Sequence, residues 1–302
     1  MNVLILLSLP PAEAGEGRLA CEFDLSPAAS LISAALPGAA VAAVRGELGE
    51  VLQSLEQHKP DVVFNLCEAP AGRPELEAHV AALFEWKGQR FTGSGSAALT
   101  LCRRKDWTKA LLDSAGVPVP QAGGFPCIVK PADQDGSAGI DPDCVCADAA
   151  ALARVRARIA GPLLVEEFLP GREFAVSLWG AAEPEYVSVG EFHFSNGLRI
   201  NSYASKWDAN SADFANTAIS YEEAAPEPAL RATVIATARR AWQVLGLRGY
   251  ARVDLRCDAA GAPRVLDVNP NPALAPGEGL HRAVLAAGWS WQAFVLKQLE
   301  WA

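Results

Sequence analysis

The sequence lacks the groupings of cysteine and histidine that mark several common protein classes. Its seven cysteines include no Cys-x-x-Cys pair, and its four histidines are dispersed along the chain. This pattern indicates neither a cysteine–histidine metal site nor a disulfide framework, so we expect reduced, mostly buried thiols. No Gly-x-Ser-x-Gly segment and no Ser/His/Asp pattern occurs either, which argues against hydrolase chemistry of that type.

Positive charge and long apolar runs are also scarce. The chain has 26 Lys and Arg against 35 Asp and Glu, a net charge of −9, which disfavours a nucleic-acid or anionic-membrane partner. No apolar run approaches the length of a membrane span. A signal peptide has a positively charged segment before its apolar segment, but no Lys or Arg precedes the apolar residues at the start of this sequence. Residues 12–14 (Ala-Glu-Ala) do resemble a cleavage site. A signal peptide is the alternative there, but a first buried strand explains the segment better.

What is present is the composition of a large globular chain. Its 302 residues suggest two or three domains, with half of the residues hydrophobic and a fifth charged. The first 95 residues alternate between strands and helices, which predicts a parallel sheet with helices on both faces. The elements predicted in this part are strands at 3–9 and 61–65 and helices at 27–36, 49–57 and 75–86. Later elements are predicted as helices at 97–115, 228–247 and 278–301, strands around 126–130, 163–178 and 185–201, and an irregular loop at 203–223.

Residues 251–274 have the pattern of a β-hairpin that could hold a metal ion. If the turn centres near Ala260 and Gly261, Asp254 lies opposite Asp267, and Arg252 lies opposite Asn269. Opposed carboxylates repel unless a positive group lies between them, and carboxylate and amide oxygens are ligands that suit Mg²⁺. The alternative is a hairpin with solvated acids on its polar face. The Asn-Pro-Asn-Pro run argues against it, because this run fixes the backbone just beyond the acids.

Two lysine-bearing segments precede the hairpin. Lys105 and Lys109 are four residues apart in the predicted helix at 97–115, which places them on one face. A solvated basic face is the alternative. A strand ending at Lys130 leads into residues 133–139, a loop rich in Gly and small residues. Such a loop can bring backbone N–H groups to phosphate oxygens, although most Gly-rich loops are only turns.

Three further segments carry candidate binding residues. The strands at 163–178 form a hinge that can offer backbone groups to a purine edge, and Glu173 could hold ribose hydroxyls; an edge hairpin with solvated acids is the alternative. Lys206 stands beside a tryptophan in the predicted loop, where an ordinary surface lysine is the alternative. Residues 93–97 look faintly like a dinucleotide fingerprint, but Ser96 as the N-cap of the next helix explains them better.

The order of these motifs resembles the ATP-grasp enzymes, and within them the D-alanine–D-alanine ligase group. The similarity runs over nearly the whole chain and is strongest from residue 91 to residue 274. It implies an α/β fold, α+β in the ATP-binding part, in which two α+β subdomains clasp the nucleotide. The implied parts are an N-terminal parallel-sheet substrate domain at 1–96, a central ATP-grasp subdomain at 97–180 and a C-terminal ATP-grasp subdomain with the metal site at 181–302.

The resemblance also implies roles for residues of this sequence. The catalytic positions are Arg252, Lys206 and Ser137. The metal, Mg²⁺ or Mn²⁺ in its place, would be held by Asp254, Asp267 and Asn269. The ATP-binding positions are Lys109, Lys130, Gly136, Ser137, Glu166, Glu167, Phe168, Leu169, Glu173, Lys206 and Leu266. The substrate positions are Glu68, Asn271 and Glu278.

An enzyme of this kind is an ATP-dependent carboxylate–amine ligase. ATP phosphorylates a substrate carboxylate to an acyl phosphate, and an amine then displaces phosphate to form an amide or peptide bond. The implied substrates are an amino acid or short peptide, the implied location is cytoplasmic, and a homodimer is common in the group. The rival hypotheses are an ATP-binding protein without catalysis, an ATP-grasp kinase or carboxylating enzyme, and an NAD-binding protein.

The sequence departs from the group where the substrates would bind. Glu13 and Glu16 keep acids near the start of the chain, but not the Gly-rich pattern around the group's ammonium-binding glutamate. Glu68 lies in a segment that replaces a His-Gly pair, and Asp267 stands where glutamate is more usual. Glu278 occupies the place of a serine that receives the second substrate's carboxylate, and a glutamate there repels a carboxylate. We therefore expect a related peptide or amide ligase rather than one that forms D-alanyl-D-alanine.

Overall fold

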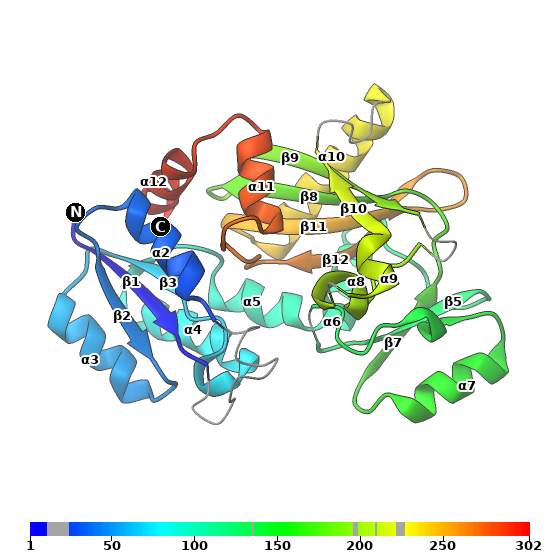
Figure 1. Cartoon of the computed structure of the whole chain (residues 1–302), viewed down its shortest axis with the longest axis horizontal. Coiled ribbons are helices and arrows are strands. Elements are labelled where there is room, and N and C mark those ends of the chain that lie inside the picture. The colour runs from blue at the N-terminus through cyan, green and yellow to red at the C-terminus, as the bar shows by residue number, and fades with distance from the viewer. Residues whose placement is uncertain (11–23, 135, 196–198, 209, 222–226) are drawn as a thin grey trace.

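The computed structural model describes residues 1–10, 24–134, 136–195, 199–208, 210–221 and 227–302. Three sheets organise this part of the chain: one of four strands, one of five and one of three. Figure 1 shows the four-stranded sheet at one end of the molecule, the three-stranded sheet at the other, and the five-stranded sheet above and between them.

The four-stranded sheet is parallel, as predicted from the alternation of strands and helices. Its strands are β1 (Val3–Ser8), β2 (Ala40–Val44), β3 (Val62–Leu66) and β4 (Arg90–Phe91), in the order β2-β1-β3-β4. The helices that accompany it are α2 (Ser26–Ala35), α3 (Leu48–His58) and α4 (Glu77–Lys87), with the 3₁₀ turns η1 (Pro70–Gly72) and η2 (Pro74–Leu76) before α4. The apolar start of the chain is therefore a buried strand, β1, and the prediction of a first strand is confirmed.

Both faces of this sheet are covered by helices. Alternate residues of a strand point to opposite faces, so Ile5 and its neighbours two residues away pack with α2 and the C-terminal helix α12 (Trp291–Trp301). Leu4 and Leu6 pack on the other face with α3 and α4. The chain ends thus meet on one side of the parallel sheet, where Figure 1 shows α2 beside α12.

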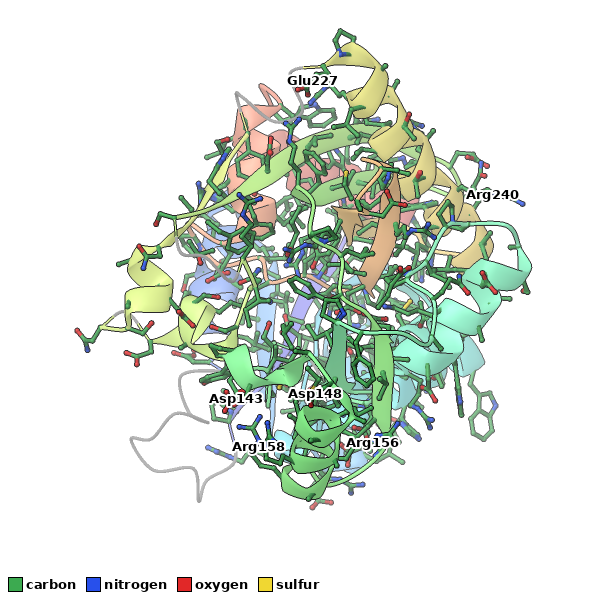
Figure 2. The ribbon with its side chains drawn as sticks, turned by 90° about the vertical axis from the view of Figure 1, so that its right-hand side faces the viewer. Asp143, Asp148, Arg156, Arg158, Glu227 and Arg240 are labelled. Atoms are coloured by element: carbon green, nitrogen blue, oxygen red, sulfur yellow. The ribbon has the colours of Figure 1, made fainter. Side chains whose placement is uncertain are left out.

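The three-stranded sheet is antiparallel and carries one helix. Its strands are β5 (Cys127–Pro131), β6 (Val145–Cys146) and β7 (Leu163–Glu167), in the order β6-β5-β7. The 3₁₀ turn η3 (Pro142–Cys144) precedes β6, and α7 (Ala149–Arg158) packs against β5 and β6. Asp148 caps α7 by accepting the Ala151 N–H at 2.8 Å. Figure 2 shows the charged side chains of this corner, Asp143 and Arg158 among them, on the outer surface.

The five-stranded sheet forms the centre of the molecule. Its strands are β8 (Glu173–Gly180), β9 (Pro184–Phe194), β10 (Thr217–Ser220), β11 (Gly249–Cys257) and β12 (Pro263–Asn269), in the antiparallel order β10-β9-β8-β11-β12. Helix α10 (Pro228–Leu245) covers one face. The strand β8, which the expected boundary at residue 180 groups with the central subdomain, is hydrogen-bonded to β9 and β11 in this sheet.

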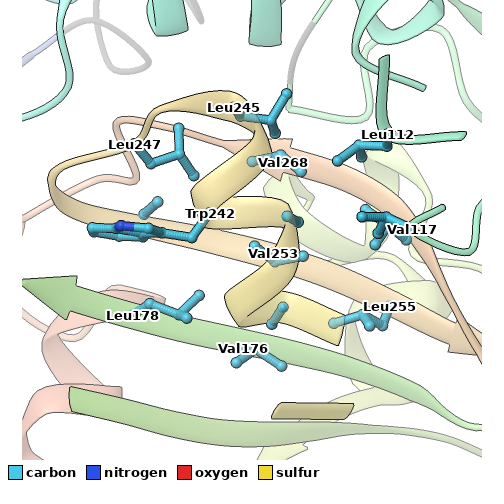
Figure 3. Packing of buried hydrophobic residues seen from close by; sticks show 14 of the residues in the cluster. Leu112, Val117, Val176, Leu178, Trp242, Leu245, Leu247, Val253, Leu255 and Val268 are labelled. Atoms are coloured by element: carbon cyan, nitrogen blue, oxygen red, sulfur yellow. The ribbon is translucent and has the colours of Figure 1, made fainter. Parts of the chain in front are cut away.

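The apolar side chains of the five-stranded sheet form a core with α10, and the polar side chains of β11 and β12 lie on the opposite face. Val176, Val253 and Leu255 point to α10, where Trp242 is fully buried (Figure 3). Each such side chain contributes about 1.5–3 kcal/mol on burial. Helix α10 ends at Leu245, two residues before the limit given above, because Gly246 takes the left-handed conformation with φ +63° as its C-cap. The residues between these apolar ones, Arg252 and Asp254 included, therefore point to the other face.

The helix predicted at 97–115 is wrong in detail, since it is two helices. They are α5 (Ser96–Arg103) and α6 (Lys105–Ser114), separated at Arg104, whose φ of −102° and ψ of 93° are extended. The prediction of Ser96 as an N-cap is also wrong. Ser96 is the first residue of α5, and its N–H donates to the Glu85 carboxylate at 2.9 Å. A glutamate from the preceding helix thus satisfies the helix terminus in place of a capping serine.

Two other segments contain more regular structure than their sequences indicate. The predicted irregular loop at 203–223 holds α8 (Tyr203–Trp207), α9 (Ala212–Ala215) and β10, so the prediction of irregular structure is wrong for these residues. The closing segment is helical, as predicted, and consists of two helices, α11 (Gly279–Ala286) and α12. Residues 11–23, with the Ala-Glu-Ala segment, Glu13 and Glu16, lie outside the described residues.

The thiols and the helices of the described part agree with the composition. The six cysteines there are all free and buried, which confirms the prediction of reduced, buried thiols for them. Within the same part of the chain, no helix combines the length and the apolar character that a membrane span needs.

Candidate active site

The hairpin β11–β12 has the predicted register. Asp254 pairs with Asp267 and Arg252 pairs with Asn269, with a bulge directly after the aspartate pair. A bulge inserts an extra residue on one strand and changes the direction of the ladder. The two acids, the amide and the guanidinium are thus brought to the face of the sheet that α10 leaves open.

Arg252 holds the Asp254 carboxylate in a two-point contact. Its Nε donates to Oδ1 at 2.7 Å and its Nη2 donates to Oδ2 at 2.9 Å. Asp254, and then the more distant Asp267, raise the pKa of the Arg252 guanidinium, against the effect of burial. This arginine therefore stays charged beside the acids and offsets the repulsion between them.

Asp267 is a buried acid that stays ionised because cations surround it. Burial alone raises its pKa, but Lys105, Lys130 and Lys109 together bring the net pKa below the usual value. Its Oδ1 accepts the Val268 N–H at 3.0 Å. The carboxylate therefore interacts electrostatically with lysines of two other segments, the helix α6 and the strand β5.

The oxygens of Asp254, Asp267 and Asn269 fit a hard divalent cation. Two carboxylates and an amide oxygen are a donor set that Mg²⁺ or Mn²⁺ accepts, with water or phosphate oxygens completing it. Among the described residues no cluster of three His, Cys, Asp or Glu side chains could hold a metal by itself. The amide oxygen of Asn269 would supply the third donor. This Oδ1 accepts the backbone N–H of Asn271 at 2.9 Å, which fixes the orientation of the amide.

Asn271, predicted as a substrate residue, has both amide atoms bonded to protein groups. Its Nδ2 donates to Glu77 Oε1 at 2.5 Å, and its Oδ1 accepts from the Tyr250 hydroxyl at 2.9 Å. The residue therefore joins the end of β12 to α4 of the parallel sheet. It also positions Asn269 through its backbone N–H.

Two predicted nucleotide lysines share one buried acid. Lys109 and Lys130 both donate to the Glu166 carboxylate, which is 1% exposed. Burial lowers the pKa of Lys109 to about 8, although Glu166 acts in the opposite direction. Burial alone raises the pKa of Glu166, but the two lysines lower it below the usual value. The alternative of a solvated basic face on α6 is therefore wrong.

Lys105 is a residue of the site that the sequence did not assign to it. Its ammonium lies 3.6 Å from Asp267 Oδ2 and donates to the Gln134 carbonyl at 2.7 Å. Its backbone N–H also donates to the Ala132 carbonyl at 2.8 Å. Lys105 thus links the hairpin to the start of the Gly-rich loop. Its spacing of four from Lys109 was the available signal, because both lysines had to share a face.

The Gly-rich loop is tied to the segment that carries Lys206. Ser137, with φ +61°, donates its hydroxyl to the Asn201 carbonyl at 2.9 Å, and the Tyr203 N–H donates to the Ile140 carbonyl at 3.0 Å. Gly136 beside it also has a positive φ, of 65°. Residue 135 and the side chain of the tryptophan after Lys206 lie outside the described residues.

Lys206 lies close to the hairpin charges. Burial, followed by the charge of Arg252, lowers its pKa, while Asp254, Asp267 and Glu173 act in the opposite direction. Lys206 is half-buried, so it is not a fully exposed surface lysine.

The hinge after β7 lies where the small and large sheets meet. The Glu167 N–H donates to the Gln121 carbonyl at 2.8 Å and the Phe168 N–H donates to the Pro126 carbonyl at 3.0 Å. Leu169 is buried. Glu173, just beyond, accepts from Arg256 at 3.0 Å, and burial raises its pKa while Arg256 opposes the rise.

Residues of α6 and β12 lie together beside the hairpin acids. They are Lys105, Thr108, Lys109, Leu112, Val265, Leu266 and Asp267. This group brings the predicted nucleotide position Leu266 and the predicted metal ligand Asp267 next to two lysines of α6.

Two acids predicted as substrate residues interact at the edge of this site. Burial and the charge of Glu278 together raise the pKa of Glu68 to about 7. Glu278 is exposed and directly precedes α11, whose first residue, Gly279, accepts the Tyr221 hydroxyl at 2.8 Å. The charges of the two glutamates therefore repel each other, although the residues lie on segments from different ends of the chain.

These features together define an ATP-grasp ligase: two sheets that meet over lysines, a hinge, and an acidic hairpin. The family model described as the D-ala D-ala ligase C-terminus matches residues 95–300, and the chain belongs to that family. The predictions of the family and of the fold class are confirmed.

Similar proteins support the same assignment. A D-alanine–D-alanine ligase of Stutzerimonas stutzeri is 30% identical over 295 residues, which cover 92% of this chain and 89% of that protein. An uncharacterised protein of Sinorhizobium fredii is 31% identical over 248 residues, 78% of this chain and 72% of that protein. The crystal structure of D-alanine–D-alanine ligase from Bacillus anthracis covers 99% of this chain and 96% of its own, with a TM-score of 0.73 and 18% identity. The same ligase complexed with ATP has a TM-score of 0.71.

Proposed function

We propose that this protein joins a carboxylate to an amine with ATP, through an acyl phosphate, and releases ADP and phosphate. The observation that supports the proposal best is the convergence of separate segments on one hairpin. Asp267 of β12 interacts with Lys105 of α6 and with Lys130 of β5, and Lys206 interacts with Asp254 and Arg252. Such a set suits a triphosphate, whose charge is spread over many oxygens.

The lysines and the metal-binding carboxylates would have separate roles at the phosphates. A divalent cation held by Asp254, Asp267 and Asn269 would neutralise phosphate charge and align the transferring group. Lys105, which links the hairpin to the phosphate loop, and Lys206 supply further positive charge to the same region. Gly136 and Ser137 belong to that loop, which would cover the phosphates with backbone N–H groups.

Arg252 would act in the second step, when the amine attacks the acyl phosphate. The attack develops an oxyanion, and a fixed cation stabilises it because no reorganisation is needed at that moment. Asp254 fixes Arg252 by the two-point contact of 2.7 and 2.9 Å. The segment around Lys206, which Ser137 holds to the phosphate loop, would exclude water that would otherwise hydrolyse the acyl phosphate.

The acceptor amine would carry no carboxylate beside its nucleophile. Glu68 and Glu278 already repel each other, so a carboxylate on the acceptor would add a third negative charge. A simple amine, a diamine or an amino acid whose carboxylate is replaced by a neutral amide would be accepted better. Bound ATP would lie between Leu266 on one side and the hinge residues Glu167 to Leu169 on the other, with its ribose at Glu173. A cytoplasmic location, a homodimeric assembly and the domain limits at residues 96 and 180 stay predictions.

The test is phosphate release from ATP and Mg²⁺ in the presence of single amino acids, dipeptides and amines. We expect release that depends on a carboxylate, and hydroxylamine should trap the acyl phosphate as a hydroxamate. Asp254→Asn and Asp267→Asn should each reduce release by at least about a hundredfold, because each removes a charged metal ligand. Asp143→Asn is the matched control, because Asp143 is an exposed aspartate in the 3₁₀ turn η3 before β6 (Figure 2).

Three outcomes would contradict the proposal in different ways. Near-normal release in both hairpin variants would remove the metal assignment. A stable phosphorylated product without hydroxamate would indicate a kinase. Nucleotide binding without turnover on any acid and amine pair would indicate a binding protein.

A further inference from the structure

Arg256 is a buried arginine on the face of the five-stranded sheet opposite helix α10. It follows Asp254 by two residues on β11, so the two side chains share that face. Its partner in the register of β8 is Glu173, the residue proposed above to hold the ribose. Arg256 is only 4% exposed.

Only part of the Arg256 guanidinium is bonded to the protein. Its Nη1 donates to Glu173 Oε2 at 3.0 Å and to the Arg199 carbonyl at 2.5 Å. Its Nε and Nη2 are buried and have no hydrogen-bond partner among the described residues. A buried charged donor without an acceptor is unfavourable, so a bound ligand with acceptor atoms would be attracted to it.

The two unpaired nitrogens lie where the sheets meet. The guanidinium carbon is 5.0 Å from the ring centre of Phe168, which follows β7 of the small sheet. It is 5.8 Å from the ring centre of Phe194, which ends β9 of the large sheet. Arg256 therefore stands between the hinge and the large sheet, next to the place proposed for the nucleoside.

We propose that Glu173 and Arg256 together bind the ribose diol of the nucleotide, an inference that rests on the proposed function. Nε–H and Nη2–H form a rigid fork that suits two neighbouring acceptor oxygens. The 2′- and 3′-hydroxyls are such a pair, and each can accept from Arg256 while donating its own hydrogen to Glu173. The fork thus specifies a ribonucleotide, because a deoxy sugar leaves a buried donor unpaired.

The experiment measures the binding of ATP, 2′-deoxy-ATP and 3′-deoxy-ATP, each with Mg²⁺, to the full chain. The wild-type protein should bind ATP at least about tenfold more tightly than either deoxy nucleotide, since each lacks one of the two acceptors. Arg256→Met should reduce that preference to within about twofold. Arg256→Lys should do the same while keeping a cation beside Glu173, so that a loss of folding is not mistaken for the effect.

The matched control is Arg264→Met. Arg264 pairs with Arg256 across the hairpin, but its Nε and Nη2 already donate to Asp258. This variant should keep the tenfold preference. A merely structural role of Arg256 would weaken all three nucleotides equally and leave their ratio unchanged.

The outcomes separate this inference from the proposed function. An unchanged ATP-to-deoxy ratio in Arg256→Met, or no preference in the wild-type protein, overturns the diol assignment while ATP binding persists. A preference for GTP over ATP that Arg256→Met abolishes also overturns the diol assignment. The Nε–H and Nη2–H of Arg256 would then donate to the base and not to the ribose. Absence of binding by any of these nucleotides would overturn the proposed function itself.

Discussion

Glu68 carries the clearest pH dependence of any single residue in the site. Burial, with a smaller effect of Glu278, raises its pKa from 4.5 in the unfolded chain to about 7. Between these two values the folded state binds a proton that the unfolded state does not, so stability falls as pH rises through this window. The penalty is complete above pH 7 and absent below pH 4.5.

Glu68→Gln should therefore remove a pH-dependent loss of stability. The difference in unfolding free energy between the variant and the wild-type protein should grow by about 1–2 kcal/mol from pH 5 to pH 8. Urea denaturation at each pH checks this. The control is Glu300→Gln, an exposed residue paired with Lys297, whose effect should stay the same at all pH values. A flat difference for Glu68→Gln would contradict the assigned burial of its carboxyl.

Glu278 should determine which amine is accepted. Glu278→Ser removes one negative charge from the acceptor side, so an amino acid acceptor that carries its own carboxylate should improve about tenfold relative to a carboxylate-free amine. The nucleotide dissociation constant should stay within about twofold, because Glu278 lies on a segment remote from the hinge. Competition between the two amines in one reaction measures the ratio directly. An unchanged ratio would count against Glu278 as a substrate contact.

At the residue scale, the hairpin was predictable and the lysine cluster was not fully so. The alternation of apolar and polar residues fixes which side chains of β11 share a face, and the turn fixes the register, so Asp254 could be paired with Asp267 from the sequence. The pairing of Lys109 and Lys130 with Glu166 joins three segments. Lys105 contacts Asp267 through a fold that no local pattern encodes.

At the scale of elements, the joint between the parallel sheet and β11 depends on two glycines. A side chain on Gly249 would place its Cβ 2.9 Å from the Cα and from the N of Gly93, and Gly249 itself has φ +75°. The segment at 93–97, which resembles a dinucleotide fingerprint, thus serves a close contact between backbones. Gly249 is therefore needed for this close packing against Gly93.

Gly249→Ala should destabilise the protein by about 2–4 kcal/mol. The backbone of Gly93 cannot move as a side chain would, so the substitution adds overpacking to the left-handed strain of an alanine there. Gly261→Ala is the matched control, because Gly261 has φ +84° but nothing within 4 Å of an added Cβ. The control should lose only about 1–2 kcal/mol. Equal losses in the two variants, by chemical denaturation, would show that strain and not contact decides.

The errors of prediction among the elements share a physical cause. The residues on both sides of Arg104 favour a helix, but the chain bends there. The cause lies in another part of the fold, because the backbone N–H of Lys105 donates to the carbonyl of Ala132. The short elements α8, α9 and β10 are too brief to show a period in the sequence. The edge strand β2 was missed because its five residues are small and alternately exposed. Longer elements with many buried residues, such as α10, were found.

At the scale of the whole molecule, the site exists only because parts from distant positions in the chain meet. Asn271 joins the end of β12 to Glu77 of α4, and Ser137 joins the phosphate loop to Asn201. The three sheets are thus connected at the rim of the site by side-chain contacts. A ligand that touches the hairpin and the loop at once should therefore stabilise the fold as a unit.

Mg²⁺ and ATP together should stabilise the whole chain more than ATP alone. At a nucleotide concentration a hundred times the dissociation constant, the unfolding free energy should rise by about 2.7 kcal/mol, because only the folded state binds. With EDTA in place of Mg²⁺ the rise should fall to less than about half, since Asp254 and Asp267 would then face the phosphates without a cation between them. Thermal melting at fixed nucleotide measures both values.

Asp267→Asn should lower the rise with Mg²⁺, because a metal ligand is lost, and increase it with EDTA, because one of the two charges that repel the phosphates is removed. Asp143→Asn should behave as the wild-type protein. A full rise in EDTA would mean that the hairpin acids bind no metal, and that the lysines alone hold the nucleotide.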